Sequence, residues 1–229
     1  MGAQIVQRPS PNCGPRKGGI LKPDIVVLHY TAMLSAAEAI ERLCDPAVEV
    51  SAHYLIARDG TITQMVDESA RAWHAGAGMW GGCDDINSRS IGIELDNDGS
   101  SPFSASLMDA LEGLLGDIRT RWDIPLQHVI GHSDLAPTRK VDPGRRFDWR
   151  RLALGGHVIW PETFGGDVPL RDSLCALGYA VDDFGLEACL DAFRMRFAPM
   201  RSGGETPEDR RAAAALADRF AVDPWQRGS

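Results

Sequence analysis

The sequence of 229 residues lacks features that would place it in several classes of protein. It has no run of like charge and a formal net charge of −8, so a protein that binds nucleic acid or another polyanion is disfavoured. Residues 1–19 contain no apolar stretch long enough for a secretory leader or a membrane span. We therefore expect a cytoplasmic protein, or one of the periplasm or cell envelope if a leader has been removed.

Paired cysteines are also missing. The five cysteines are scattered, their number is odd, and none belongs to a CxxC motif. This pattern is typical of reduced thiols rather than of a disulfide framework. No cysteine lies close in the sequence to His29 or His132, the histidines that are candidates for a metal site, and this disfavours a closed zinc site rich in thiolates.

Strand and helix patterns alternate over the first two thirds of the chain, which predicts an α/β domain with helices packed on one sheet. The expected elements are strands at 25–29, 51–58, 61–66, 90–97 and 128–131, with helices at 35–43 and 106–122. We assign this domain to residues 1–154 and a Gly/Pro-rich linker to 155–167. Residues 168–229 carry three short helical patterns, at about 170–177, 186–197 and from 206 onward, and these predict a small helical domain.

The stretch from His128 to Trp149 contains several side chains that could bind a metal or take part in catalysis. It holds His132, Lys140 and Asp142 in a segment that prolines and a glycine interrupt, so we expect an irregular loop there. His132 and Asp142 supply two ligands of a metal site, and His29, which ends the first strand pattern, is the best candidate for the third. Three protein ligands with one open position are typical of catalytic Zn²⁺, which acidifies a bound water.

Two further residues complete the expected chemistry of hydrolysis. Glu94, at the end of the strand pattern SIGIEL, is placed to take a proton from water and to pass it to a leaving amine. Lys140 is placed to stabilise the developing oxyanion. Taken singly, each of these residues has a plain structural interpretation: a satisfied histidine, a solvated strand end or a surface lysine. A single site that explains all five is the interpretation we favour.

Residues 25–150 resemble the zinc-dependent N-acetylmuramoyl-L-alanine amidases of the type-2 (AmiD/AmpD) family. The segments that carry the resemblance are VVLHYTA, SAHYLIARDGTITQMV, AWHAG, SIGIELDN and GHSDLAPTRKVDPG, extended by SPNC and FDWRRLA. The resemblance implies a mixed β-sheet flanked by helices, related to peptidoglycan recognition proteins. It also implies zinc ligands at His29, His132 and Asp142, with Glu94 and Lys140 as catalytic residues. The tail is similar, over a shorter match, to helical peptidoglycan-binding modules.

The family's site loop also suggests substrate contacts. Trp73 and His74 in AWHAG are candidate substrate-binding residues, and Asn87 and Arg89 are weaker candidates for holding polar groups of a peptide. His53 has the alternation of a core residue or of one that supports the site. For Trp80 and Trp160, core packing is favoured over a stacking role.

Three functions fit these observations. The favoured one is hydrolysis of the amide bond between N-acetylmuramic acid, or its 1,6-anhydro form, and L-alanine, with peptidoglycan or an anhydro-muropeptide as partner. A non-catalytic peptidoglycan-binding protein of the same fold is the second, but it would not need Asp142, Glu94 and Lys140 together. The third is a phage-type lytic endolysin, which performs the same chemistry. The sequence does not reveal an oligomeric state.

Overall fold

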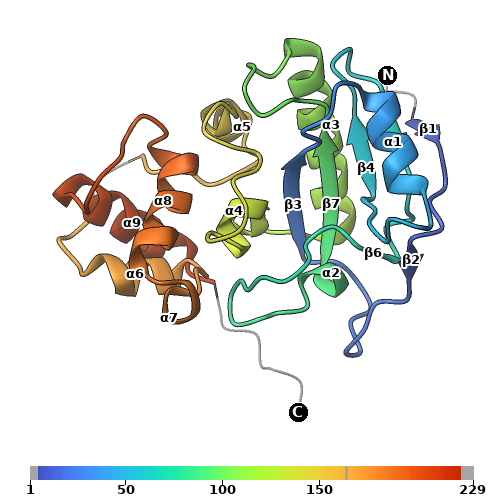
Figure 1. Ribbon diagram of the computed structural model, residues 1–229. Coiled ribbons are helices and arrows are strands. Elements are labelled where there is room, and N and C mark those ends of the chain that lie inside the picture. Colours follow the sequence, from blue (N-terminus) through green and yellow to red (C-terminus); the bar gives the residue numbers. More distant parts are fainter. Residues whose placement is uncertain (1–4, 163–164, 223–229) are drawn as a thin grey trace.

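The fold is built on a mixed β-sheet flanked by helices, as the sequence predicts (Figure 1). The structure is a computed structural model, and it describes residues 5–162 and 165–222. The six strands of the main sheet, in spatial order, are β1 (Ile5–Gln7), β5 (Ile62–Gln64), β4 (Tyr54–Ile56), β7 (Ser90–Leu95), β3 (Ile25–Tyr30) and β8 (Val129–Gly131). Only the β4–β5 hairpin, turning at the expected Asp59-Gly60, is antiparallel in this sheet. A separate pair joins β2 (Cys13–Gly14) to β6 (Arg71–Ala72).

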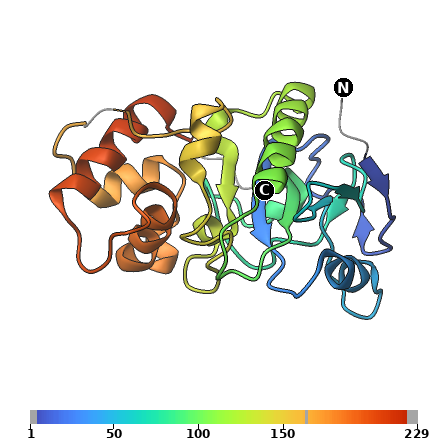
Figure 2. The same cartoon turned by 90° about the horizontal axis from the view of Figure 1, so that it is seen from above.

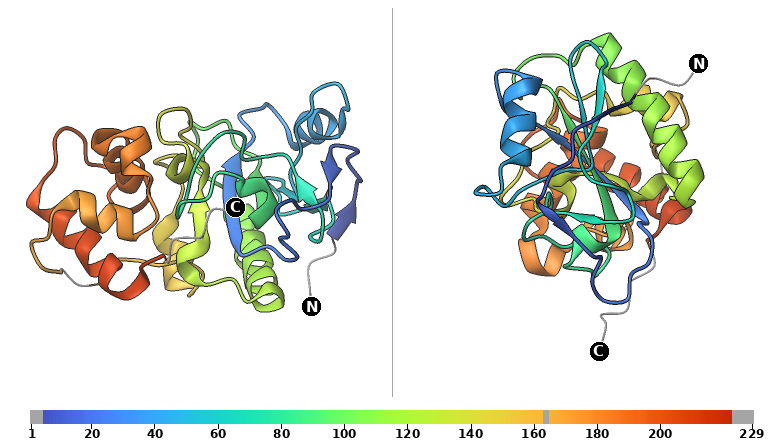
Figure 3. Two further views of the ribbon diagram at one scale, coloured as in Figure 1. Left: turned by 90° about the horizontal axis from the view of Figure 1, so that it is seen from below. Right: turned by 90° about the vertical axis from the view of Figure 1, so that its right-hand side faces the viewer.

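Helices lie on both sides of this sheet. The helix α3 (Ala105–Trp122) covers one face, and α1 (Ala36–Cys44) lies on the opposite side, as the end-on view in Figure 3 shows. The hydroxyl of Ser35 accepts a hydrogen bond from the backbone N–H of Glu38 at 3.3 Å, so the expected cap begins α1. Shorter helical segments are α2 (Ile86–Arg89), η1 (Leu126–His128), α4 (His132–Leu135) and α5 (Trp149–Leu154).

The two-residue period of the central strands separates core from site. In β3, Val26 and Leu28 pack with the leucines of α3, whereas Ile25 and Val27 belong to a different apolar cluster on the other face. In β7, Ile91, Ile93 and Leu95 join the α3 side. Because successive side chains of a strand point to opposite faces, His29 in β3 and Glu94 in β7 both point away from α3.

One local prediction was wrong. The segment after β8 was expected to be an irregular loop throughout, but His132–Leu135 form the one-turn helix α4. The prolines that interrupt the pattern, Pro137 and Pro143, both follow this turn, so they do not oppose it. The remainder of the stretch up to α5 is irregular, and the peptide bond between Asp142 and Pro143 is cis.

The tail contains the three expected helices and one additional turn. These helices are α6 (Leu170–Ala176), α7 (Val181–Phe184), α8 (Leu186–Phe197) and α9 (Pro207–Phe220). They lie beside α4 and α5, at the end of the molecule away from β1 (Figures 1 and 2). No helix within residues 5–162 and 165–222 combines the length and apolarity needed to cross a membrane.

The tail shares its apolar core with the sheet. A single cluster contains Ile25, Val27 and Ile130 from β3 and β8 together with Leu174 and Phe193 from the tail. The division into residues 1–154, 155–167 and 168–229 therefore stays a prediction about independent domains. Residues 163–164 of the expected linker and 223–229 of the tail lie outside the described residues.

Candidate functional site

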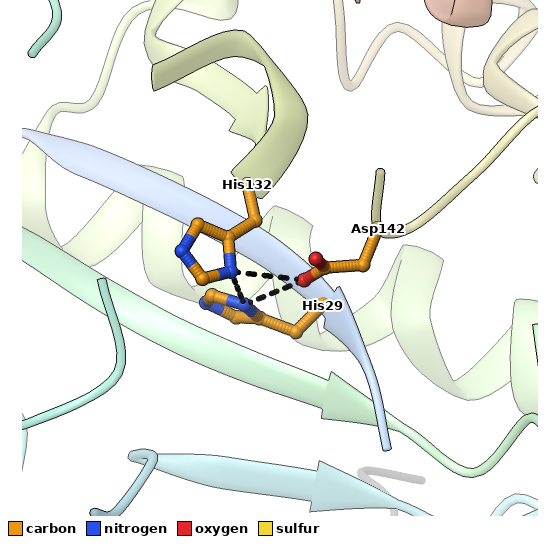
Figure 4. Close-up of side chains that lie close together, drawn as sticks. All are labelled: His29, His132 and Asp142. Atoms are coloured by element: carbon orange, nitrogen blue, oxygen red, sulfur yellow. Dashed lines mark hydrogen bonds and ion pairs between the residues drawn. The ribbon is translucent and has the colours of Figure 1, made fainter. Parts of the chain in front are cut away.

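Three buried side chains from separate segments converge at the carboxyl end of β3 (Figure 4). His29 comes from β3, His132 begins α4, and Asp142 lies in the loop that follows. The two Nδ1 atoms of the histidines are 2.9 Å apart, and each lies 3.0 Å from Oδ2 of Asp142. The side chains are nearly inaccessible, because these residues are only 2, 3 and 7% exposed.

The tautomer of His132 follows from its second nitrogen. Its Nε2 lies 2.9 Å from the backbone carbonyl oxygen of Ala75, an atom that can only accept a hydrogen bond. Nε2 must therefore carry the proton, and Nδ1 of the neutral ring presents its lone pair to His29 and Asp142. A backbone carbonyl that fixes a histidine in this way is a usual support for a metal ligand.

A longer chain of hydrogen bonds fixes His29. The hydroxyl of Ser90 donates to the carbonyl of Ile86 at 2.7 Å, so its oxygen accepts from Nε2 of His74 at 3.1 Å. Nδ1 of His74 then accepts from Nε2–H of His29 at 3.0 Å. The lone pair of His29 Nδ1 is thereby left facing the other two groups, as at His132.

The resulting donor set fits a divalent cation. Two bare imidazole nitrogens and a carboxylate oxygen within about 3 Å of one another repel unless positive charge lies between them. Burial, and after it the neighbouring His132, lowers the pKa of His29 to about 4, which keeps the ring neutral and able to ligate. Two histidines and one carboxylate are a ligand set found in catalytic zinc sites.

Gly92 makes room for the ring that orients His29. It lies on the site face of β7, between Ser90 and Glu94, and the ring of His74 covers it. A Cβ atom at position 92 would lie 2.4 Å from Cγ of His74, closer than such atoms approach. A side chain from the AWHAG loop thus fills the space that a strand residue would otherwise occupy.

Glu94 stands beside the three candidate ligands. The parallel pairing of β3 with β7 places it directly opposite His29. Burial, followed by the negative charge of Asp142, raises the pKa of Glu94 to about 8, and Lys140 acts in the opposite direction. Its Oε2 is buried and has no hydrogen-bond partner within the described residues. A buried acid without a fixed partner is available to exchange protons with something bound in front of it.

A cavity of about 460 Å³ opens over this group. It brings together seven of the nine residues that the sequence suggested, namely Trp73, His74, His29, Glu94, His132, Lys140 and Asp142. The cavity is also lined by one side of α1, through Ala39, Arg42 and Leu43. The volume is suitable for a small molecule or for one end of a longer one.

Asn87 and Arg89 do not line this cavity. Oδ1 of Asn87 accepts hydrogen bonds from the backbone N–H groups of His74 and Ala75, at 3.0 and 2.9 Å. The guanidinium of Arg89 pairs with the carboxylate of Asp24, at the start of β3. Asn87 thus fixes the loop that carries His74, and Arg89 ties α2 to β3. Their expected role as substrate contacts stays a prediction.

Two residues of the site region were missed. Arg139 lines the cavity and donates to the carbonyl of Ala75 at 2.9 Å, the oxygen that also accepts from His132. Ser90 anchors His74. The sequence could have pointed to Arg139, because it adjoins the candidate residue Lys140. A serine at the start of a strand gives no such indication of a role in the site.

Comparisons with known proteins agree with this geometry. The model of the N-acetylmuramoyl-L-alanine amidase family matches residues 20–145. The N-acetylmuramoyl-L-alanine amidase AmiD of Escherichia coli (strain K12) is 34% identical over 234 residues, which cover 87% of this chain and 84% of AmiD. The 1,6-anhydro-N-acetylmuramyl-L-alanine amidase AmpD of Haemophilus influenzae is 42% identical over 105 residues, covering 45% of this chain and 57% of AmpD.

A solved structure extends the likeness through the tail. It is the complex of AmiD from E. coli with the substrate anhydro-N-acetylmuramic acid-L-Ala-D-gamma-Glu-L-Lys. It superposes with a TM-score of 0.80 and 32% sequence identity, and the match covers 94% of each chain. The similarity therefore includes α6–α9 as well as the sheet.

The close approach at Gly92 leads to a prediction about stability. We expect Gly92→Ala to lower the free energy of unfolding by about 1–3 kcal/mol, the usual scale for overpacking a core, because the ring of His74 must move. Gly113→Ala is the matched control: it lies in α3 with nothing within 4 Å of an added Cβ, and it should raise stability by about 0.5–1 kcal/mol. Denaturant unfolding of both variants measures this, and a Gly92→Ala protein as stable as the wild type would contradict the packing.

Proposed function

Because this chain belongs to the N-acetylmuramoyl-L-alanine amidase family, we propose that it hydrolyses the amide bond between N-acetylmuramic acid, or its 1,6-anhydro form, and L-alanine in fragments of peptidoglycan. The observation that carries the proposal is the convergence of His29, His132 and Asp142 beside Glu94 in one cavity. The substrate named for the AmiD complex supports the fragment class. Such an enzyme acts in the turnover or recycling of the cell wall.

Zinc is the metal that we propose for the site, with His29, His132 and Asp142 as its ligands. Imidazole and carboxylate together suit zinc, and the absence of a fourth protein ligand among the described residues leaves a position open for chemistry. When bound, the metal supplies Lewis acidity at the reacting carbonyl and water. The hydrogen-bond chain through His74 and the carbonyl of Ala75 hold the two rings in the ligating orientation.

Glu94 is proposed as the residue that moves the proton. Hydrolysis requires a base to receive a proton from the attacking water and an acid to protonate the leaving amine, and one carboxylate can do both in turn. The raised pKa of Glu94 shows that its environment favours the protonated form, whereas a cation at the ligand cluster would favour the carboxylate. The two effects act on the pKa of Glu94 in opposite directions, which suits a group that first takes and then gives a proton.

Lys140 and the walls of the cavity are proposed to hold the substrate. The ammonium of Lys140 lines the cavity and is close enough to act electrostatically on both Glu94 and His29, so it can stabilise negative charge on the carbonyl oxygen. Trp73 offers an indole to the sugar or the peptide. His74 is held at both ring nitrogens, so we assign it to orienting His29 rather than to the substrate contact first suggested for it.

The ligand assignment predicts metal content. Purified protein should contain one zinc ion per chain by elemental analysis, and the double variant His29→Ala, His132→Ala should contain none. His157→Ala removes a histidine outside the cavity and serves as the control that keeps its metal. Full zinc occupancy in the double variant would reject the assignment.

The division of roles predicts a kinetic result. Glu94→Gln should lower kcat by about 10²-fold or more, the lower end for loss of an acid–base group, with zinc retained. Lys140→Ala should lower kcat by roughly 10²-fold, the scale for one oxyanion donor, with little change in KM. The exposed residues Glu41 and Lys22 provide the controls Glu41→Gln and Lys22→Ala, which should keep wild-type kinetics. Near-normal turnover by zinc-loaded Glu94→Gln would overturn the role of Glu94.

The nature of the substrate predicts a rate difference. We expect faster release of the peptide from purified anhydro-muropeptide than from intact sacculi, because a cavity of about 460 Å³ suits a small fragment, which reaches it more readily than a bond within the cross-linked wall. Product analysis by mass spectrometry on equal amounts of reactive bonds makes the comparison. Exclusive activity on sacculi would instead support wall lysis.

The cytoplasmic location expected from the sequence stays a prediction.

A further inference from the structure

The tail places two buried polar side chains against the segment that carries His132. The hydroxyl of Tyr179 donates to Oδ1 of Asp134 at 2.7 Å. The guanidinium of Arg196, on α8, donates to Oδ2 of Asp134 at 3.4 Å and to the carbonyl of Val129 at 2.8 Å. Asp134, Tyr179 and Arg196 are only 1, 3 and 3% exposed, so this contact is sealed from solvent.

Asp134 determines the shape of the turn on which His132 sits. Its Oδ2 also accepts the backbone N–H of Gly131 at 2.8 Å, closing the chain around His132. A helix of one turn is not stable by itself, so α4 depends on such contacts for its geometry. Without Arg196, the buried carboxylate of Asp134 would keep its desolvation penalty and lose the charge that offsets it, which favours a change of its orientation.

The tail also holds the segment that carries Asp142. The guanidinium of Arg145, three residues further on, donates to the carbonyls of Pro199 and Arg201 at 3.1 and 3.2 Å and pairs with Asp191 of α8. Within the segment, the backbone N–H of Ser133 donates to the carbonyl of Asp142 at 2.9 Å. The two ligand positions are thus tied to each other and to the same helix of the tail.

We infer that the tail clamp, defined as Tyr179 and Arg196 acting on Asp134, positions His132 and thereby tunes the affinity of the site for its metal. Tyr179 and Arg196 are positioning residues, since neither lines the cavity. The inference rests on the proposed metal-dependent function and adds to it a role for α6–α9 in the reaction itself. Residues that orient a ligand from outside the ligand set commonly change metal affinity by about 10- to 100-fold.

The structure supplies a matched control for Arg196. Arg194 lies two residues earlier on α8, is 1% exposed, and pairs with Asp209 at 2.5 Å. Its other partners are the carbonyls of Gly203 and Gly204, so its hydrogen bonds stay within the tail. Substituting Arg194 therefore removes a buried ion pair of the tail without removing a hydrogen bond to α4.

The test compares Arg196→Met with Arg194→Met. Zinc dissociation constants are measured by competition with a chelator, at a temperature where circular dichroism shows each variant folded, together with kcat and KM on anhydro-muropeptide. We expect Arg196→Met to weaken zinc binding about tenfold and to lower kcat at subsaturating zinc, with KM unchanged. Arg194→Met should lose thermal stability but bind zinc as the wild type does. Wild-type zinc affinity in both variants, or an equal loss of affinity in both, overturns the inference.

A milder pair keeps the test decisive if Arg196→Met does not fold. Tyr179→Phe removes only the hydroxyl that Asp134 accepts from, and we expect it to weaken zinc binding by roughly threefold, below the range usual for direct supports of a ligand. Its control is Tyr54→Phe, which removes a buried hydroxyl that donates to Glu68 at 2.8 Å, away from the site, and should leave zinc binding unchanged. Unchanged affinity in Tyr179→Phe overturns the clamp. A wild-type protein that binds no zinc would instead contradict the proposed function, and the clamp with it.

Discussion

The site depends on the parallel pairing of β3 with β7. This pairing sets His29 opposite Glu94, and the alternation of side chains turns both away from α3. A shift of one residue in register would exchange core and site faces on the shifted strand. Because Val26, Leu28, Ile91 and Ile93 bury their side chains under α3, the apolar core fixes the register, and the register fixes the distance between the candidate ligand and the candidate acid.

Hydrogen bonds then determine which nitrogen of each histidine is free to bind a metal. An imidazole can ligate only through a nitrogen without a proton, and each ring of the site has its other nitrogen engaged, by Ala75 or by His74. The geometry therefore specifies tautomers as well as positions. Gly92 belongs to the same arrangement, because its missing side chain admits the ring of His74.

Local patterns in the sequence predicted much of this. The alternating strands, the capped helix at Ser35 and the Asp59-Gly60 hairpin follow from short-range physics, and the structure reproduces them. The residues suggested for the metal cluster meet: His29 ends a predicted strand, His132 directly follows another, and Asp142 lies in the loop after it. The role of Asn87 and the contact of Arg196 with Asp134 were not predictable, because such partners lie 12 and 62 residues apart and leave no periodic trace. The separate domains stay a prediction, because periodicity does not show which surfaces share a core.

The apolar cluster that joins the tail to the sheet has a consequence for cooperativity. If α6–α9 opened, apolar residues of the cluster that they share with the sheet would be exposed to water along with the inner face of the tail, so partial unfolding carries a large cost. A shared core of this kind favours unfolding of both parts in one transition. We also expect the linkage to be reciprocal: a ligand that orders the segment around His132 would protect the tail from opening, and contacts that hold the tail closed would favour ligand binding at the site. The helices α6–α9 do not line the cavity, yet their stability is coupled to ligand binding there.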